Sequence, residues 1–536
     1  MMNKIKYLAI IFLAISGLYG LNSCSDELNV DPTAELEGDF YNSEQRMQQG
    51  VGACYAMFAN LYGPVLNDPG MHAMFMLPGD DISNFDSGNA AFAAFSGLNE
   101  SNGQVTYAWR RYYQLLYRCN FMLEKLEEEE VKALYRRDGL WQANKGEVLF
   151  LRAWAYYRLY DWFGKAPLQD KRIPSIGSAI LPPSEGTQML DKAISDLNLA
   201  VELLPNVNYW TPATEKGRVW NESAYGLLVR AHVLRARHTK NANGDYAKAI
   251  TAFGKITSRE LVTFHYNFSV HHENNKESLF EFQASSAPAM DNAWLDNDFD
   301  VNIGQMGAQY HYFTNHWGNY MSGKYGPSLK LRNAFEDGDP RKAETFAPIF
   351  TNVNGNVNVP QPYPSWDKFG GNQMQKYVKP GHCEFERDWG LSSPNNYRLM
   401  RYADIKLLAA EAYLQTNQPA LALKEVNDIR ERARRSTPDG SISSVPADLT
   451  AVTMQDIMDE RLRELAGEDG IRWTDLRSWH RAGYIDLSTW TASDFGFEFD
   501  AENFRLSIPT HLLFPIPKRE LDTNPLMAAS GNNPGY

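Results

Sequence analysis

The chain has 536 residues, of which 43% are hydrophobic and 22% charged, proportions that are ordinary for a globular protein with a large core. Its 52 basic and 65 acidic residues give a net charge of −13. Because nucleic-acid backbones require clustered Lys and Arg, this acidic balance argues against a nucleic-acid partner.

The first 23 residues have the pattern of a secretory signal peptide rather than of a folded element. Lys4 and Lys6 form a positive start, and residues 7–21 form an apolar stretch that is too short for a typical membrane-spanning helix. This stretch ends in "LNSC" at residues 21–24, which resembles the lipobox of bacterial lipoproteins. We therefore expect Cys24 to become the mature N-terminus and to carry acyl chains that hold the protein at a membrane.

Three further cysteines, Cys54, Cys119 and Cys383, lie far apart in the sequence. Their odd number and the lack of a C-x-x-C pair argue against a disulfide framework or a zinc site. We interpret them as packed thiols, with one disulfide plus a free thiol as the alternative. No stretch after the signal peptide approaches about 18 apolar residues, so we expect the rest of the chain to lie outside the bilayer.

Helical periodicity recurs along the chain in pairs. Residues 105–130 and 141–168 place apolar side chains at three- and four-residue steps, and Gly164 with Pro167 supplies a stop. Two more pairs follow, at 221–237 with 245–256 and at 402–416 with 419–435. Two-helix units of roughly 34 residues are typical of tetratricopeptide repeats. We therefore predict a mainly α fold, a tetratricopeptide-like scaffold of helix pairs with large irregular loop insertions.

The predicted domain organisation is a single globular domain after the signal peptide. It covers residues 24–536, with an N-terminal half at about 30–275 and a C-terminal half at about 276–536. Three segments interrupt the helical pattern and are rich in Gly, Asn, Asp and aromatic residues: 77–97, 289–328 and 351–372. Because loops on a rigid frame often carry binding residues, these insertions are the places to look for a site.

Catalytic and metal motifs are weak throughout. The sequence has no G-x-S-x-G, H-E-x-x-H, Walker or G-x-G-x-x-G motif, and "HHENN" at 271–275 lacks the second His of a zinc helix. Asp296, Asp298 and Asp300 alternate as in the start of a calcium loop, but Ile303 stands where that loop needs Gly and Gln309 where it needs Glu. A solvated acidic loop is the simpler interpretation, and calcium stays a weak candidate.

The segment around these acidic residues is the best candidate for a ligand site. It is rich in rings and amides, and sugars offer C–H faces that stack on aromatic rings and hydroxyls that hydrogen-bond to amides. The alternative is that the rings anchor the loop onto the helices. The aromatic residues of this segment are Trp294, Tyr310, Tyr312, Trp317, Tyr320 and Tyr325, and the first five are the candidates for glycan contact.

Four segments resemble the SusD/RagB family of outer-membrane glycan-binding lipoproteins of Bacteroidota. They are "GEVLFLRAWAYYRLYDWFGKAPL" at 146–168, the helix pair at 401–434, "DERLRELAGEDGIRWTDLRSWHRAG" at 459–483 and the ending at 514–536. They occur in the family's order, and the resemblance runs from the lipobox to the last residue. One departure is "AGEDGIRW", where family members commonly have a shorter segment; we expect only a local loop difference.

The resemblance implies a SusD-like fold and a non-enzymatic function. Such proteins sit on the outer face of the outer membrane, bind oligosaccharide or polysaccharide, and cap a TonB-dependent, SusC-like transporter that imports it. The resemblance also implies a site built from the loop at 81–89 and the loop at 294–320. It adds Asp81, Asn84 and Phe85 to the aromatic candidates for glycan contact.

The charged residues in the matching C-terminal segment have a different predicted role. We interpret them as ion pairs that hold helices together, since structural networks are a common use of such charges. They are Glu460, Arg461, Arg463, Glu464, Arg472, Asp475 and Arg477.

Two alternatives to glycan capture stay open at the level of sequence. One is a surface glycoside hydrolase on a helical scaffold, because a catalytic carboxylate pair is defined in space rather than in sequence. The other is a transporter lid that gates without binding sugar or that passes peptides.

Overall fold

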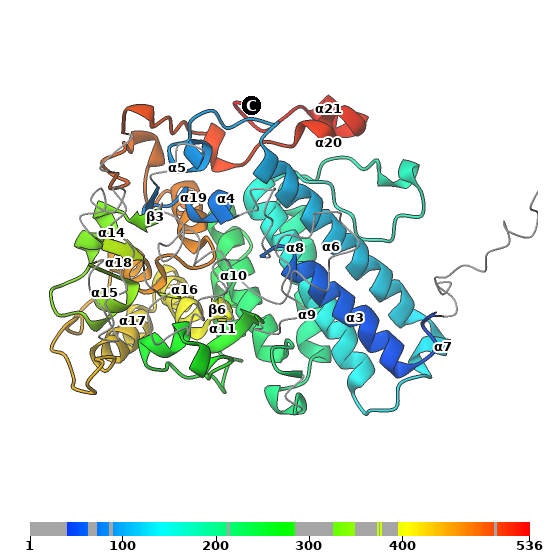
Figure 1. The fold of residues 1–536 in the computed structure, drawn as a ribbon, viewed down its shortest axis with the longest axis horizontal. Helices are drawn as coiled ribbons and strands as arrows, with labels where there is room; N and C mark the ends of the chain where they lie inside the picture. Colours follow the sequence, from blue (N-terminus) through cyan, green and yellow to red (C-terminus); the bar gives the residue numbers. More distant parts are fainter. Residues whose placement is uncertain are drawn as a thin grey trace, which may run out of the picture.

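Helices dominate the structure, as the sequence predicts, and strands are few and short (Figure 1). The computed structural model describes residues 40–62, 72–84, 89–211, 215–284, 325–348, 372–374, 376–377, 395–497 and 501–536. Several residues singled out in the sequence lie outside these ranges, namely Cys24, Phe85, Trp294, Asp296, Asp298, Asp300, Tyr310, Tyr312, Trp317, Tyr320 and Cys383.

Four long helices form the N-terminal part of the molecule, on the right of Figure 1. They pack as α3 on α6 and α8, α6 on α8, and α8 on α9. The predicted helix at 105–130 is α6; the side chain of Asn102 caps it by accepting a hydrogen bond from the Val105 N–H at 3.1 Å. Their bounds are α3 Glu44–Ala59, α6 Gly103–Glu127, α8 Leu140–Phe163 and α9 Gln188–Leu203.

Helix α8 is buried on almost every face, which exceeds the prediction of one buried face. The predicted positions, such as Leu149 and Tyr156, are buried, and so are Glu147 and Arg152 on other faces. Neighbours on several sides explain this, since α3, α6 and α9 all contact α8. The helix ends where predicted, because Gly164 adopts φ +69° and its N–H bonds back to the Tyr160 carbonyl at 3.0 Å.

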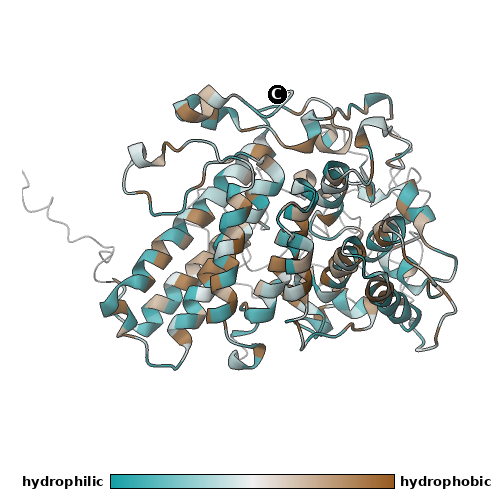
Figure 2. Ribbon diagram, turned by 180° about the vertical axis from the view of Figure 1, so that it is seen from behind, coloured by the Kyte–Doolittle hydropathy of each residue, from teal (hydrophilic) through white to brown (hydrophobic). Residues whose placement is uncertain are grey.

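The two later helix pairs form as predicted. The first pair packs on α9 through α10, and its α11 packs on α16 of the second pair, so the units stack as tetratricopeptide-like repeats do. Figure 2 shows the brown, hydrophobic faces of these helices turned toward their neighbours. The bounds are α10 Asn221–Thr239, α11 Asp245–Phe253, α16 Tyr402–Gln415 and α17 Pro419–Arg434.

Two further helices of the C-terminal part, α18 and α19, contact α16 and α10 respectively. The C-terminal segment crosses the end of α8 at the top of Figure 1, where the Asn533 amide donates to the carbonyls of Phe163 at 3.1 Å and Phe514 at 2.7 Å. The remaining helices are α4 His72–Met76, α5 Ala90–Ala93, α7 Glu129–Lys132, α14 Leu329–Ala334, α15 Pro340–Thr345, α18 Met454–Leu465, α19 Ile471–Ala482, α20 Lys518–Thr523 and α21 Pro525–Ser530.

Three small antiparallel ribbons complete the described structure, each with two strands. They join segments that are far apart in sequence, pairing β1 with β3, β2 with β6 and β4 with β5. Their bounds are β1 Ile82–Asn84, β2 Ser278–Phe282, β3 Tyr325–Pro327, β4 Phe346–Pro348, β5 Asn372–Met374 and β6 Tyr397–Arg401.

Candidate functional site

The β1–β3 ribbon is the point where two of the predicted binding loops attach. Its register pairs Ile82 with Pro327 and Asn84 with Tyr325. Residues 82–84 of the first predicted loop (81–89) form β1, and residues 325–327, near the end of the predicted insertion at 289–328, form β3. Where the first loop ends, the Asn89 amide donates to the Tyr325 hydroxyl at 3.2 Å. The described anchors of both loops therefore meet at one end of one ribbon.

Asp80 holds this ribbon to the C-terminal helices. Its carboxylate pairs with Arg472 of α19 at 2.5 Å and with Lys330 of α14 at 2.7 Å. Burial alone raises the pKa of this carboxyl, but the two cations outweigh it and lower the pKa to about 2. The Asp80 carbonyl also accepts a 2.6 Å hydrogen bond from the Ser328 hydroxyl, just after β3. The charged carboxylate is thus a structural anchor.

Asp81 has the opposite electrostatic environment. One carboxylate oxygen, Oδ2, accepts a hydrogen bond from the Gly467 N–H at 2.8 Å, and within the described structure the other, Oδ1, has no hydrogen-bond partner. Burial is the main cause that raises the pKa of this carboxyl to about 6, and the charge of Asp80 adds to it, although the Gly467 N–H and Arg472 oppose the rise. Two adjacent carboxylates therefore have pKa values far apart.

Of the predicted glycan-site residues, Asp81 and Asn84 lie in the described ranges. Both are buried, with 3% and 8% of their surfaces exposed. In the structure Asn84 lies in the β1–β3 ribbon and Asp81 directly before it. Direct contact of these two residues with a glycan stays a prediction, as it does for the aromatic residues of the long loop. The sequence singled out Tyr325 as an aromatic residue of the insertion, but it did not reveal that Tyr325 pairs with Asn84 or that Gly467 bonds to Asp81, because no periodic pattern links positions so far apart.

A network of amide side chains lies beside β2 and β6, next to the last described residues before the long aromatic insertion. The Asn396 amide donates to Glu281 at 2.9 Å and to Gln283 at 3.0 Å, and Gln283 donates to Asn274 at 3.0 Å. Asn396 also accepts from the Ala284 N–H at 2.8 Å, at the last described residue before the loop. Each of these polar side chains hydrogen-bonds to another member of the network, so the network, which we call the polar platform, holds this end of the insertion in place.

The "HHENN" segment contributes to this platform rather than to a metal site. Tyr266 and His272 stack with ring centroids 3.7 Å apart, and the Glu273 carboxylate accepts from the Asn396 N–H at 2.7 Å. Burial raises the pKa of Glu273 to about 7. Within the described ranges no group of three or more His, Cys, Asp or Glu residues can hold a metal ion, and the weak calcium candidate lies outside those ranges.

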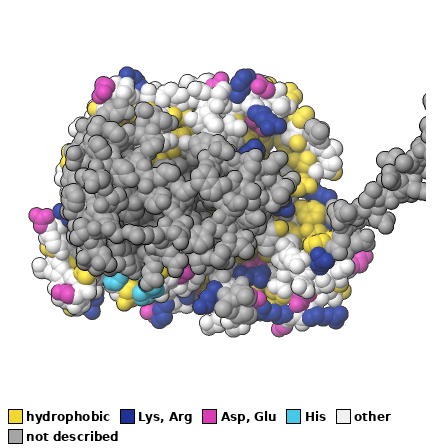
Figure 3. All heavy atoms as spheres, viewed as in Figure 1, with side chains coloured by type: hydrophobic (Ala, Val, Ile, Leu, Met, Phe, Trp, Pro, Cys, Tyr) yellow, Lys and Arg dark blue, Asp and Glu magenta, His cyan; other side chains and the backbone are white. Residues whose placement is uncertain are grey.

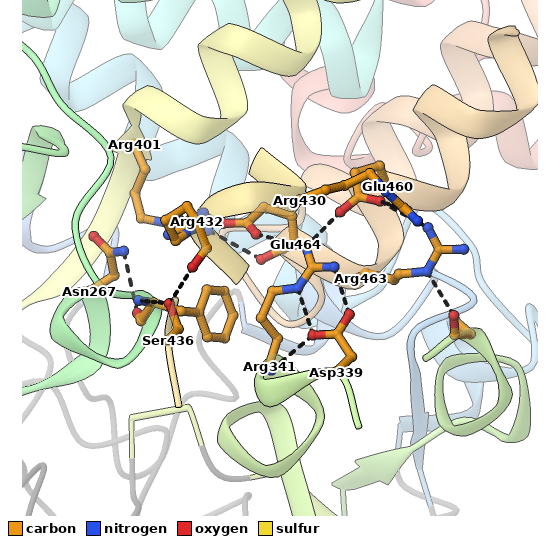
Figure 4. A network of polar contacts seen from close by, with 12 residues as sticks. Asn267, Asp339, Arg341, Arg401, Arg430, Arg432, Ser436, Glu460, Arg463 and Glu464 are labelled. Carbon is orange, nitrogen blue, oxygen red and sulfur yellow. Dashed lines mark hydrogen bonds and ion pairs between the residues drawn. The ribbon is translucent and has the colours of Figure 1, made fainter. Parts of the chain in front are cut away.

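The predicted ion pairs of the C-terminal segment are confirmed, and they form a buried network (Figure 4). Glu464 contacts Arg341 and Arg401 at 3.1 Å each and also Arg432. Burial alone raises the pKa of Glu464, but the three guanidinium groups lower it to about 2. Glu460 contacts Arg341, at 2.6 Å, and two further arginines. These are Arg430 at 2.9 Å and Arg463 at 3.0 Å.

The other predicted charges also join separate elements. Arg461 pairs with Asp475 at 2.6 Å, which links α18 to α19. Arg477 of α19 pairs with Asp161 of α8 at 2.8 Å, so this contact links the two parts of the molecule. Arg461, Asp475, Arg477 and Asp161 are all buried, and their charges serve the fold.

The cysteine interpretation is confirmed for the two residues that the structure describes. Cys54 of α3 and Cys119 of α6 are free and fully buried. Burial raises the pKa of the Cys119 thiol, and the neighbouring Cys54 thiol raises it further, so Cys119 is not a reactive surface group.

None of the helices in the described ranges is both long enough and apolar enough to cross a membrane.

Comparison with known protein families agrees with this architecture. The profile of the SusD family matches residues 276–536, and a second profile, described as starch-binding associating with outer membrane, matches residues 28–232. Two SusD-like proteins of Formosa agariphila are 25% and 23% identical to the chain. Each alignment covers all of this chain and 100% and 99% of the relative, respectively.

Solved structures share the fold at low sequence identity. A SusD homologue of Bacteroides thetaiotaomicron superposes with a TM-score of 0.73 at 17% identity, over 94% of this chain and 99% of the other. Surface glycan-binding protein A of Bacteroides fluxus gives 0.71 at 20% identity, over 92% and 100%. A laminarin binding SusD-like protein gives 0.69 at 20% identity, also over 92% and 100%. With both profiles, full-length relatives and the shared fold in agreement, the chain belongs to the SusD/RagB family.

Proposed function

We propose that this protein captures oligosaccharide or polysaccharide at the cell surface and delivers it, uncleaved, to a TonB-dependent, SusC-like transporter of the outer membrane. Membership of the SusD/RagB family supports this, as do structural neighbours named for laminarin and surface glycan binding. The observation that carries it is the β1–β3 ribbon, where the described anchors of both predicted binding loops meet.

The proposed binding chemistry is stacking combined with hydrogen bonding. Trp294, Tyr310, Tyr312, Trp317 and Tyr320 supply rings for sugar faces. The first loop adds Asp81, Asn84 and Phe85. A rigid root favours binding because less loop entropy is lost when the ligand is held.

A glycan array with the soluble chain from residue 25 onward tests the proposal. After a ligand is found, Trp294→Ala and Trp317→Ala are each expected to weaken binding by about two- to tenfold, the effect of one lost stacking contact. Equal thermal unfolding midpoints of the variants and the parent serve as the folding control. Unchanged affinity in both variants would remove that loop from the site.

The same samples separate capture from the two alternatives. Chromatography of the glycan after prolonged incubation is expected to show chains of unaltered length, and shortened chains would support the hydrolase instead. A protein that binds peptides but no member of the array would support the peptide lid.

Membrane attachment is tested at the predicted lipid site. Cys24→Ala is expected to release the protein from the outer-membrane fraction, because the acyl chains are lost. Retention of this variant would contradict lipidation. Co-purification of the wild-type chain with a large barrel transporter from detergent-solubilised outer membranes tests the partner, and a protein recovered alone after gentle solubilisation would count against it.

A further inference from the structure

A small cavity lies where five helices converge. Helix α10 contacts α8, α16 and α19, and it stands between α8 and α16 in Figure 1. The cavity has a volume of about 20 Å³, and its lining comes from these four helices and from α18. A cavity needs roughly 10–15 Å³ to hold a water molecule, so this space suits a water and is too small for a saccharide.

The polar lining of this cavity is charged. Figure 3 shows a different arrangement at the surface, where the basic and acidic side chains in view lie interspersed along the upper and lower edges of the molecule. Buried charges are costly unless their polar atoms find partners, so any atom left unpaired is informative. The charged lining residues, each no more than 5% exposed, are Arg158, Arg230, Arg237, Asp404, Arg461 and Asp475.

Most of these charges pair with one another. Arg237 Nη1 donates to Asp475 Oδ1 at 2.9 Å, and Arg461 Nε donates to Asp475 Oδ2 at 2.6 Å. Arg230 Nε donates to Asp404 Oδ2 at 2.7 Å. Both oxygens of Asp475 and one oxygen of Asp404 are therefore occupied by guanidinium groups.

Three polar atoms of the lining keep the capacity for another hydrogen bond. Arg158 binds Asp469 through Nη2, but within the described structure its Nε has no hydrogen-bond partner. No hydrogen bond from a described residue reaches the hydroxyl of the neighbouring Tyr157 either. Asp404 Oδ1 pairs with Arg461 Nη2 at 2.8 Å, and a carboxylate oxygen has a second lone pair to offer.

The protonation states of these three groups are fixed. Burial alone lowers the pKa of Arg158, but the charge of Asp469 raises it well above the ordinary value, so Nε–H is a donor only. Burial alone raises the pKa of Asp404, but two guanidinium groups lower it, so its oxygens are acceptors only. Burial raises the pKa of Tyr157 to about 12, so its hydroxyl keeps the proton.

This combination of donor and acceptor selects the occupant. A chloride ion could accept from Arg158 but could not donate to Asp404. A sodium ion could bind the Asp404 carboxylate but would meet the N–H group of a charged guanidinium. A water molecule both accepts and donates, and buried waters typically make two to four such bonds.

We propose that this cavity is a buried water site, in which water accepts a hydrogen bond from Arg158 Nε, donates to Asp404 Oδ1 and bonds to the Tyr157 hydroxyl. Tyr157 and Arg158 lie on α8 and Asp404 on α16, so the water joins the N-terminal and C-terminal helices. The inference concerns the scaffold and does not depend on glycan capture.

High-resolution diffraction from crystals of the full soluble chain tests the site directly. A density peak is expected in the cavity about 2.6–3.2 Å from Arg158 Nε, Asp404 Oδ1 and the Tyr157 hydroxyl. Crystals soaked in sodium bromide and measured at the bromine absorption edge are expected to show no anomalous peak there. A cavity without a density peak would overturn the proposal, and an anomalous peak would overturn it in favour of an anion.

Urea unfolding of Tyr157→Phe tests the water in solution. The variant is expected to raise the equilibrium constant for unfolding about two- to tenfold, the effect of one lost hydrogen bond. The matched control is Tyr112→Phe of α6, because the Tyr112 hydroxyl is also buried, lies outside the cavity lining and has no hydrogen-bond partner in the described structure. Removing an unpaired hydroxyl is expected to leave that constant unchanged or to lower it. Equal changes in the two variants would overturn the proposed bond to Tyr157.

Discussion

The N-terminal and C-terminal helices of this protein are held together by different interactions. In the N-terminal part the centre is aromatic: Trp154 of α8 is fully buried, with the ring centroids of Phe58 and Phe150 5.7 and 6.1 Å away, and Phe280 of β2, from the C-terminal half, packs on it at 5.6 Å. In the C-terminal part the centre is ionic, with Glu464 surrounded by three arginines.

The difference predicts two kinds of response to substitution. Apolar packing loses stability in proportion to the volume and contacts that change. A buried charge network responds more steeply, because removing one member leaves its partners charged and without compensation. The two parts are joined by ion pairs such as Arg472 with Asp80 as well as by aromatic contacts such as Phe58 with Phe280, so the boundary between them combines both kinds of response.

The largest effect is expected for Glu464→Gln. This change keeps the shape of the side chain but removes the charge that neutralises Arg341, Arg401 and Arg432, so we expect a loss of about 3–5 kcal/mol in the free energy of unfolding. Urea unfolding followed by circular dichroism measures it. The control is Glu431→Gln, which removes an exposed pair with Arg435 and is expected to cost about 0.3–0.5 kcal/mol. Similar losses in the two variants would contradict the ionic core.

The next effect concerns the pH dependence at Asp81. In the folded protein the pKa of the Asp81 carboxyl is raised from 3.8 to about 6. The folded state therefore favours the protonated carboxyl, and ionisation of this group destabilises the fold as the pH rises through about 6. The stability of Asp81→Asn relative to the parent is therefore expected to fall by on the order of 1–3 kcal/mol when the pH drops from about 7.5 to about 4. Thermal unfolding across this pH range measures it.

Asp439 supplies the control for this pH experiment, because its pKa is shifted in the other direction. It is exposed, and hydrogen bonds from the Ser441 hydroxyl and N–H lower the pKa of its carboxyl. Asp439→Asn is expected to show a pH dependence of the opposite sign. A difference in thermal stability between Asp81→Asn and the parent that does not change with pH would show that the Asp81 carboxyl does not titrate as described.

A smaller effect is expected from two glycine substitutions that test how tightly the N-terminal helices pack. Alanine in a helix is ordinarily about 1 kcal/mol better than glycine. At Gly146 of α8, however, a Cβ would lie 2.7 Å from the Leu204 side chain, so we expect Gly146→Ala to destabilise by about 1–2 kcal/mol. At Gly52 of α3 an added Cβ would meet none of the described atoms within 4 Å beyond the adjoining helix backbone, and Gly52→Ala is expected to stabilise by about 0.5–1 kcal/mol. If urea unfolding showed stability changes of the same sign for Gly146→Ala and Gly52→Ala, the result would contradict this packing difference.

The smallest effect is expected from salt. Buried pairs are screened far less than exposed ones, because ions do not reach them. Between about 0.05 and 1 M NaCl, the stability difference between Glu464→Gln and the parent is expected to change by less than about 0.5 kcal/mol. The small difference for Glu431→Gln is expected to vanish. A strongly salt-dependent Glu464 effect would indicate that water and ions reach the network.

Much of the fold could be predicted from sequence, because helical periodicity and stop signals are local. The helix at 221–237 begins at Asn221, as predicted, and Gly164 ends α8. Burial of α8 on nearly every face was missed, since periodicity reveals one apolar stripe but not neighbours on several sides.

The candidate site was less predictable because its contacts are spatial. The sequence indicated that Glu460 and Glu464 form ion pairs, but not that Arg341 and Arg401, from other segments, are partners. It likewise placed Asp81 near a binding loop without revealing that the side chain points to the Gly467 N–H. The composition of a segment and its place in the order of segments along the chain identify it as a candidate for binding. The partners of each side chain, by contrast, are set only when the chain folds.

We expect the network around Glu464 to form late in folding, because it joins charged residues from segments far apart in the chain. Its members include Glu277, Arg341, Arg401 and Arg432, so the central carboxylate is the last of these to emerge from a ribosome or an export channel. Before it arrives, the three arginines lack a common counter-charge and favour a hydrated, open state over burial. We therefore expect a chain that stops short of residue 464 to leave hydrophobic surfaces between its helices exposed and to be degraded faster than the full chain.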